Sequence, residues 1–259
     1  MLYSVMPHMG IKVDFVLSCG CECRPAHYAK MLFLRKFSSP CDWMMNYSLS
    51  CFLEILRSEG KLMFRNAKYD EVKKWVYDAD NGMISMHDFH CDQPLEDQLP
   101  AFYEKMVRRT KNTIKQILKS RRVGIIMNRN IAKKEIVDFA TSMNLLFPDC
   151  YFFIVNVNDK PYQQKLKTEY IIETEKYTIT EISFNDAHEN GREIQNNPSC
   201  WRGNVRIWEN LMLNYFHVKG RRLQYIKAIL GRRVKQCVKF VCKLFGRRVN
   251  MLLQYLLNR

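Results

Sequence analysis

Three consecutive segments in the middle of the chain constrain its fold most strongly. Residues 122–128 (RVGIIMN) and 151–157 (YFFIVNV) are short apolar runs, and residues 132–146 between them carry apolar side chains at helical spacing. The runs are typical of buried strands. A strand, a helix and a second strand joined by short loops form a right-handed unit with parallel strands. The pattern therefore predicts an α/β fold with a mainly parallel sheet flanked by helices.

A second stretch of the same kind lies near the amino end of the sequence. Residues 11–17 (IKVDFVL) are rich in β-forming residues, Gly20 interrupts the run, and Pro25 suits the first turn of a helix. We expect a strand, a tight turn and then a helix over residues 26–37. Such a turn places Cys21 and Cys23 near a helix amino terminus, where unpaired N–H groups and the helix dipole favour a thiolate.

The cysteines of this turn have two other interpretations. Cys19, Cys21 and Cys23 could bind a metal ion or simply fill the core. Their alternating spacing lacks the C-x-x-C pattern of zinc sites, so we expect no metal and no cofactor.

The remaining elements are predicted from shorter patterns. We expect helices over residues 49–56, 99–120 and 201–216, strands over 61–64 and 83–86, and a hairpin or a pair of edge strands over 170–184.

A histidine follows one of these predicted strands. If strand 83–86 belongs to the parallel sheet, His87 lies at the carboxyl edge of the sheet beside Cys23, where ligands gather. An imidazole activates a thiol by taking its proton and later returning it. His188, in a turn-rich segment, is a second candidate base, with an exposed loop residue as the alternative.

A carboxylate could hold this imidazole in its working orientation, as the third member of such sites does. Asp42 and Asp88 are the two candidates, and Asp42 could instead cap a helix over residues 43–45. Neighbouring side chains on an extended segment point apart, which favours Asp42 over Asp88 for His87.

Several short motifs recur in an order that resembles a known family. They are Ser18-x-Gly20-x-x-Cys23-x-x-Ala26, Arg35-Lys36-Phe37, Pro40-x-Asp42-Trp43, His87-Asp88-Phe89 with Asp92, and Trp201-x-Gly203-Asn204-x-x-x-Trp208. Over roughly residues 11–216 the chain resembles a bacterial family described as papain-like cysteine peptidases of unknown function. It departs from that family at Cys19, where the family usually has Leu, and at Cys41, where it usually has an apolar or aromatic residue.

The resemblance implies a cysteine hydrolase. Cys23 would attack a carbonyl, His87 would move protons, Asp42 or Asp88 would orient the imidazole, and backbone N–H groups of residues 20–23 would bind the oxyanion. Side chains and backbone expected to border the substrate are those of Ser18, Gly20, Trp43 and Asn204. The substrate would be a small molecule, a peptide or a saccharide. A strand directly before Cys23 differs from the papain fold, whose nucleophile begins a long central helix.

Two other functions are compatible with the same residues. The first is a cysteine-dependent acyltransferase that modifies a saccharide or lipid during polysaccharide or envelope assembly. The second is a membrane-associated scaffold whose cysteines only pack.

The formal net charge of +15 is concentrated at the carboxyl end of the sequence. Residues 219–259 contain 12 Lys or Arg and no Asp or Glu, which leaves +3 for the residues before them. We therefore expect a catalytic domain over residues 1–217 and a basic helical appendage over residues 218–259.

The appendage is predicted to be an amphipathic helix. Its cationic side consists of Arg232, Arg233, Lys235, Lys239, Lys243 and Arg247. An apolar face opposite such a side favours an anionic membrane surface over nucleic acid, with packing on the core domain or on a partner chain as the alternative.

Localisation is inferred from what the sequence lacks. The first ten residues have no basic and apolar signal pattern, no uncharged run reaches the length of a membrane span, and the ten cysteines are unevenly spaced. These features predict a cytoplasmic protein, peripheral on the inner membrane through its basic tail.

Overall fold

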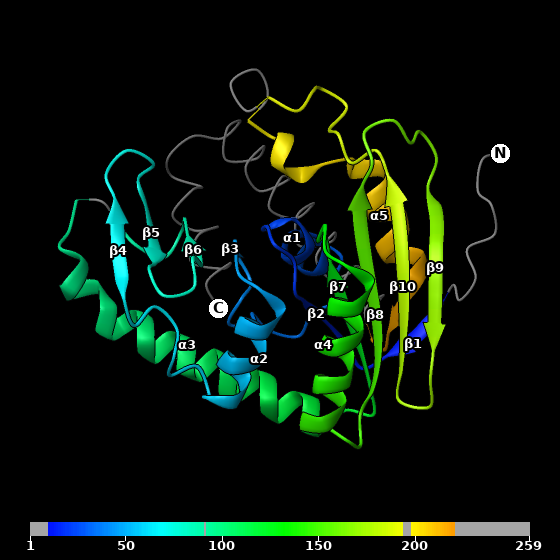
Figure 1. Ribbon diagram of the computed structural model, residues 1–259, viewed down its shortest axis with the longest axis horizontal. Helices are drawn as coiled ribbons and strands as arrows, with labels where there is room; N and C mark the ends of the chain where they lie inside the picture. The colour runs from blue at the N-terminus through cyan, green and yellow to red at the C-terminus, as the bar shows by residue number, and fades with distance from the viewer. Residues whose placement is uncertain (1–9, 91, 194–197, 221–259) are drawn as a thin grey trace, which may run out of the picture. The chain divides into compact units, whose positions relative to one another are not determined.

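The structure is a computed structural model that describes residues 10–90, 92–193 and 198–220 (Figure 1). The chain divides into two compact units, Met1–Lys219 and Gly220–Arg259. The predicted basic helix, with Arg232, Arg233, Lys235, Lys239, Lys243 and Arg247, lies outside the described residues. None of the described helices combines the length and the apolar character needed to cross a membrane.

A five-stranded sheet forms the centre of the first unit, in the order β2-β7-β8-β10-β9. Four neighbouring strands are parallel: β2 (Phe15–Ser18), β7 (Arg122–Met127), β8 (Tyr151–Asp159) and β10 (Tyr177–Phe184). The fifth strand, β9 (Lys167–Glu173), pairs antiparallel with β10 at the edge of the sheet. The predicted α/β class with a partly parallel sheet is confirmed, and the segment 170–184 is a hairpin.

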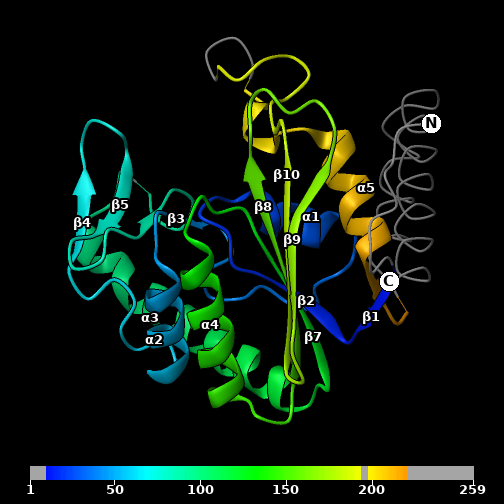
Figure 2. The ribbon, with the colours of Figure 1, turned by 45° about the vertical axis from the view of Figure 1, so that its right-hand side comes forward.

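Helices cover both faces of this sheet (Figure 2). On one side lie α2 (Leu49–Arg57), α3 (Leu95–Leu118) and α4 (Lys133–Leu146), and on the other side lie α1 (Arg24–Met31) and α5 (Val205–Tyr215). Successive side chains of a strand point to opposite faces. Ile125 of β7 therefore packs in the core on the α4 side, while Ile126 packs with Trp208 of α5. Both isoleucines are fully buried, which explains the unbroken apolar run in the sequence.

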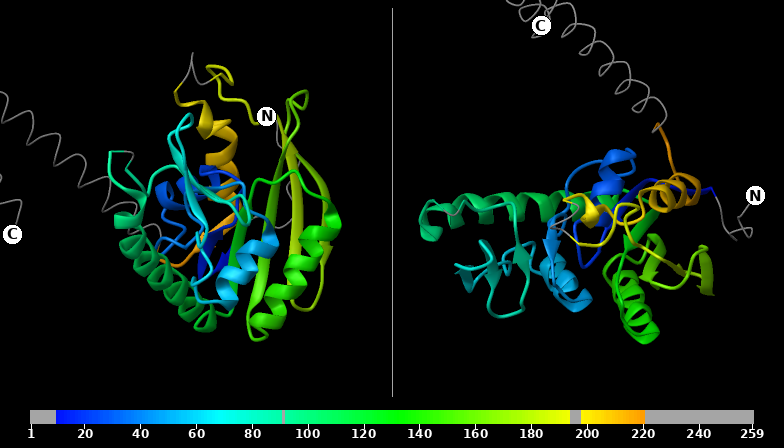
Figure 3. Two further views of the ribbon diagram at one scale, coloured as in Figure 1. Left: turned by 60° about the vertical axis from the view of Figure 1, so that its left-hand side comes forward. Right: turned by 90° about the horizontal axis from the view of Figure 1, so that it is seen from above.

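A second, antiparallel sheet has the order β3-β6-β5-β4 and lies beside α3 (Figure 3). Its strands are β3 (Met44–Met45), β6 (Ile84–Ser85), β5 (Trp75–Asp78) and β4 (Ala67–Asp70). The prediction that strand 83–86 belongs to the parallel sheet is therefore wrong. Residues 43–45 likewise enter a strand, so Asp42 caps no helix there.

Three predicted elements are interrupted by residues with positive φ. Phe33 at φ 56° terminates the helix expected to reach residue 37, and Gly203 at φ 64° separates a short 3-10 helix, η1 (Cys200–Arg202), from α5. Phe64 at φ 54° lies in a turn where a strand over residues 61–64 was expected, and its N–H donates to Asp78 Oδ2 at 2.9 Å. A left-handed residue reverses the chain and ends a helix or strand locally.

A short parallel pair, β1 (Ile11–Val13) and β11 (Phe216–Val218), joins the two ends of the described body. The apolar run 11–17 is thus divided at Asp14 into two strands that belong to different sheets. Val218 pairs with Val13, so this body continues beyond the boundary expected at residue 217.

Candidate functional site

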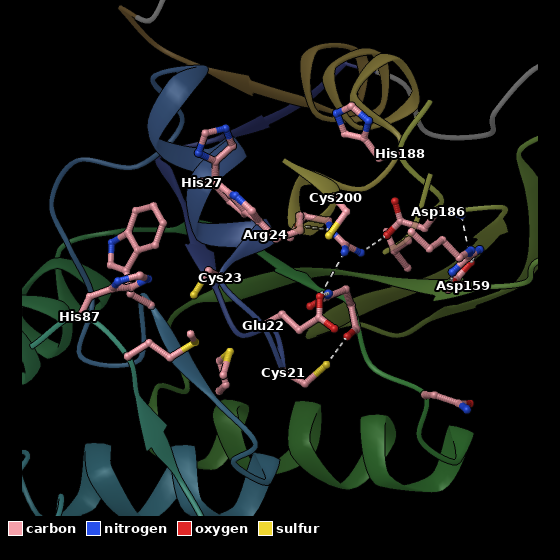
Figure 4. A pocket seen from close by; sticks show the side chains of 18 of the residues that line it. Cys21, Glu22, Cys23, Arg24, His27, His87, Asp159, Asp186, His188 and Cys200 are labelled. Carbon is pink, nitrogen blue, oxygen red and sulfur yellow. Dashed lines mark hydrogen bonds and ion pairs between the residues drawn. The ribbon is translucent and has the colours of Figure 1, made fainter. Parts of the chain in front are cut away.

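A large cleft of about 1220 Å³ opens where the parallel strands end (Figure 4). Its walls come from the segments that follow β2, β7 and β10, from the last residues of β8, and from the loop after β6. The carboxyl ends of parallel strands meet at one edge of a sheet, which is where such folds bind ligands. A cleft of this size exceeds the volume that a small ligand fills, so it suits an extended or a two-part substrate.

The predicted nucleophile lies in this cleft. Cys23 is the residue that precedes α1, with Pro25 in the first helical turn as expected, and its thiol is half-buried. No side chain caps α1, and its first turn contains no acidic residue. The helix amino terminus is thus available to an anionic group.

The ionisation of Cys23 differs from the expectation of an easily formed thiolate. Burial, followed by the negative charge of Glu22, raises the pKa of the Cys23 thiol to about 11. Desolvation of a charged sulfur outweighs the helix dipole, which contributes only about 0.3–1 kcal/mol at a helix terminus. In the protein without substrate, Cys23 is therefore a neutral thiol near pH 7.

His87 lines the same cleft and lies exposed at its rim, after β6. Its ring packs edge-on against Trp43, with centroids 6.3 Å apart and planes at 83°. Cys23 lies between His87 on one side and Arg24 and Asp186 on the other (Figure 4). Among the described residues, no hydrogen bond joins the Cys23 thiol to His87. The two predicted catalytic residues share a cleft, although they come from different sheets.

Neither predicted carboxylate orients His87. Asp42 is buried and accepts hydrogen bonds from Ser18 Oγ at 2.5 Å, from Ser39 Oγ at 2.7 Å, and from the guanidinium of Arg35. Asp42 therefore holds Ser18, the last residue of β2, in place and, among the described residues, forms no hydrogen bond with the imidazole.

Asp88 likewise bonds groups other than the imidazole of His87. It accepts from Ser85 Oγ at 2.9 Å and forms an ion pair with Lys105 Nζ at 2.6 Å. Asp42 and Asp88 therefore stabilise the backbone segments that precede Trp43 and His87, respectively.

The predicted substrate-binding residues divide into two groups. Trp43 lines the cleft, whereas the hydroxyl of Ser18 is committed to Asp42. Asn204 caps α5 by accepting from the N–H of Ile207 at 3.2 Å. Gly20 is packed so closely that a Cβ there would lie 2.4 Å from Asn128 Oδ1. Ser18, Gly20 and Asn204 therefore do not line the cleft, and they stabilise the segments around it.

Arg129, in the loop that follows β7, is a structural element of the site. It is 5% exposed, and its guanidinium donates to three backbone carbonyls: Cys19 O at 2.7 Å, Gly20 O at 3.1 Å and Tyr47 O at 2.5 Å. One planar cation thereby fastens the turn after β2 to the segment that carries Trp43. A guanidinium suits this role because its five donors form a rigid fork.

One wall of the cleft is a chain of ion pairs that the sequence patterns did not reveal. Arg24 pairs with buried Asp186 and, at 3.2 Å, with Glu22, and its Nε donates to Trp201 O at 2.8 Å. These contacts attach the start of α1 to the segment after β10. Their signal in the sequence is weak, because the two segments lie far apart along the chain.

A second ion pair extends this wall. Arg192 bonds both carboxylate oxygens of Asp159, at 2.6 and 3.1 Å. Asp159 is the last residue of β8, so this pair also lies at the carboxyl edge of the sheet.

Two further histidines line the cleft. His188 is buried rather than exposed, and its Nδ1 accepts from the N–H of Asn190 at 3.1 Å. His27 lies one helical turn after Cys23, a Cys-x-x-x-His spacing that places both on one helix face. Burial, together with the positive charges of Arg202 and Lys30, lowers the pKa of His27 to about 4.

The seven cysteines among the described residues are free thiols, and Cys21, Cys23 and Cys200 line the cleft. Within the described residues, no three His, Cys, Asp or Glu side chains are grouped so that they could hold a metal ion. The Cys21 thiol donates to the backbone carbonyl of Asn128 at 2.8 Å, so it faces the end of β7.

Comparison of the chain with models of known families, with curated proteins and with solved structures finds no match.

Proposed function

We propose that the chain is a cysteine-dependent hydrolase in which Cys23 is the nucleophile and His87 transfers protons. The observation that carries this proposal is the convergence of Cys23 and His87 on one large cleft at the carboxyl edge of a parallel sheet. The thiol sits at an uncapped helix amino terminus, where N–H groups can bind a developing oxyanion. The resemblance of residues 11–216 to papain-like cysteine peptidases points to the same pair.

The reaction proceeds through a thioester. The Cys23 sulfur attacks the substrate carbonyl while the thiol proton passes to His87, and the bond to the leaving group breaks as His87 returns that proton to it. Water then attacks the thioester, His87 accepts a proton from the water, and the Cys23 sulfur leaves with that proton. The products are a carboxylic acid, the protonated leaving group and the original enzyme.

The raised pKa of Cys23 shapes this mechanism. Because the Cys23 thiol is neutral in the free protein, the sulfur is not already ionised as part of a thiolate–imidazolium pair before the substrate binds. Proton transfer to His87 must accompany the attack, as in general base catalysis. His27 is a poorer base, since its pKa of about 4 weakens its hold on a proton.

Transfer of the acyl group is the alternative outcome of the same chemistry. A hydroxyl or amine of a saccharide or lipid would then replace water in the second step. The cleft volume of about 1220 Å³ supports this alternative, because it leaves room for an acceptor beside the acyl group.

The test is acylation of purified protein by a panel of acyl p-nitrophenyl esters and acyl thioesters, read by intact-protein and peptide mass spectrometry. We expect an acyl adduct on Cys23 and release of p-nitrophenol, both lost in Cys23→Ala. His87→Gln should slow acylation by about 100-fold or more without lowering Tm. Matched controls are Cys200→Ala, a second half-buried thiol of the cleft, and His90→Gln, an exposed histidine outside it.

Two results would refute the proposal. Adducts spread equally over several cysteines would mean that Cys23 is only a packing residue, as a scaffold requires. Equal acylation rates in His87→Gln and His90→Gln would remove His87 from the mechanism.

A further inference from the structure

The two sides of the cleft differ in chemistry, with Cys23 between them (Figure 4). On the side of Arg24 and Asp186, the charged groups are joined in ion pairs. On the side of His87, the lining includes Trp43, Met45 and Met86, which give it an apolar surface. Met86 is 44% exposed there, so its side chain is accessible from the cleft.

The charges that line the cleft are almost completely compensated. Each of its four carboxylates has a cation: Glu22 and Asp186 pair with Arg24, Asp159 pairs with Arg192, and Asp88 pairs with Lys105. Three arginines line the cleft, and Arg109 is the one that has no carboxylate partner within the described part of the chain. Arg24 serves both Glu22 and Asp186, so the paired group around Arg24 carries one excess negative charge. The positive charge of Arg109, in contrast, has no counter-ion beside it among the described residues.

The position of Arg109 relative to the predicted base follows from helix geometry. Lys105 of α3 reaches Asp88, the residue after His87. Arg109 is four residues further along α3, so it lies on the same helix face about 6 Å from Lys105. The unpaired guanidinium thus belongs to the side of the cleft on which His87, Trp43 and Met86 lie.

We propose that this side of the cleft binds an acyl group with an apolar body and a negatively charged substituent, carboxylate or phosphate, which pairs with Arg109. The inference rests on the proposed function, because it assigns the acyl portion of the substrate. The apolar side chains bury the body of the acyl group, and Arg109 supplies the counter-ion. The opposite side, with its paired charges and amides, then receives the leaving group or the acceptor.

Three alkylating probes with the same six-carbon body test this assignment. They are N-iodoacetyl-hexylamine, which is neutral, N-iodoacetyl-6-aminohexanoic acid, which carries a carboxylate, and N-iodoacetyl-6-aminohexyl phosphate. In each case the Cys23 sulfur displaces iodide, and peptide mass spectrometry gives the rate at Cys23. Comparison of the two anionic probes identifies which anion the site prefers.

We expect the better anionic probe to label Cys23 at least about five-fold faster than the neutral probe at low ionic strength, and less so in 0.3 M salt. Arg109→Gln should abolish the advantage, whereas Arg109→Lys should keep most of it. Arg108→Gln is the matched control, because Arg108 is the neighbouring exposed residue of the same helix and does not line the cleft. The rate with the neutral probe is the reference for each variant, and Arg108→Gln should label with all three probes at the wild-type rate.

Anionic probes that label no faster than the neutral one, or whose advantage survives in Arg109→Gln, would overturn the inference. Its failure can be distinguished from failure of the proposed function. Acyl turnover that needs Cys23 and His87 without any charge preference refutes only the anion site. If the protein shows no acyl turnover but labels faster with anionic probes in a way that depends on Arg109, only the proposed hydrolase function is refuted.

Discussion

Replacement of Arg129 by methionine tests whether one buried cation holds the two walls of the cleft together. Methionine approximates the volume of the arginine stem and keeps the apolar contacts, but it removes every donor. Three carbonyls, those of Cys19, Gly20 and Tyr47, then lose their partner inside the protein.

The expected loss of stability can be estimated from these three bonds. A buried polar group left without its partner costs about 1–3 kcal/mol. The three carbonyls share one donor group and can relax together, so their costs do not simply add. We therefore expect Arg129→Met to lower the free energy of unfolding by about 3–5 kcal/mol.

Urea denaturation followed by tryptophan fluorescence measures this difference, provided that wild type and variant unfold with similar dependence on urea. Arg129→Lys keeps the charge but not the fork that spans three carbonyls, so we expect an intermediate loss of about 2 kcal/mol. Arg108→Met, on the exposed face of α3, should change stability by less than about 0.5 kcal/mol. A loss below about 1 kcal/mol in Arg129→Met would refute the clamp.

Three further outcomes follow from the site. Iodoacetamide labelling of Cys23 in the free protein should be slow near pH 7 and rise toward an inflection near pH 11; an inflection below about pH 8 would contradict the buried thiol. Gly20→Ala should lower stability by about 1–3 kcal/mol, because its Cβ would lie 2.4 Å from Asn128 Oδ1, and an unchanged Tm would show that the turn can move. The pKa of His27 falls from 6.5 to about 4 on folding, so the unfolded chain binds a proton in this range that the folded protein does not. This difference corresponds to at most about 3.4 kcal/mol at 1.36 kcal/mol per pKa unit, and solvent screening of the half-buried ring reduces it. The free energy of unfolding should therefore fall between about pH 6.5 and pH 4 by roughly 1–2 kcal/mol more in wild type than in His27→Gln, and equal pH profiles would refute the shift.

The main sheet was predictable because its strands leave a strong local signal. A strand buried on both faces is an almost continuous apolar run, as in β7 after Arg122, where Ile125 and Ile126 enter opposite cores. The short strands leave no such signal. β3 and β6 have two residues each, so the hydrogen bonds of the antiparallel sheet, and not side-chain periodicity, define them. This is why His87 was assigned to the parallel sheet.

The position of Cys23 in the candidate site could be predicted from the sequence, whereas the contacts of Asp42 and Arg129 that hold the site together could not. Cys23 and Pro25 belong to one local turn, so their placement at a helix start follows from nearby residues. Asp42 and Arg129 act through contacts with segments remote in sequence, and composition says nothing about which partners they meet. The pKa of Cys23 depends on burial by residues remote in sequence. The prediction of an easily formed thiolate used only the local turn, and it was therefore wrong.

The relative position of Cys23 and His87 in the cleft depends on a residue, Arg129, that contacts neither reactive group. A neutral thiol and an exposed imidazole do not attract each other, so their separation must be set by the backbone that carries them. Arg129 anchors the turn before Cys23 to the segment of Trp43, and Trp43 packs edge-on against His87. The distance between thiol and imidazole is thus fixed through an arginine that touches neither. In the mechanism proposed above, a substrate bound between the two groups accepts the attack of the Cys23 sulfur while His87 takes the thiol proton.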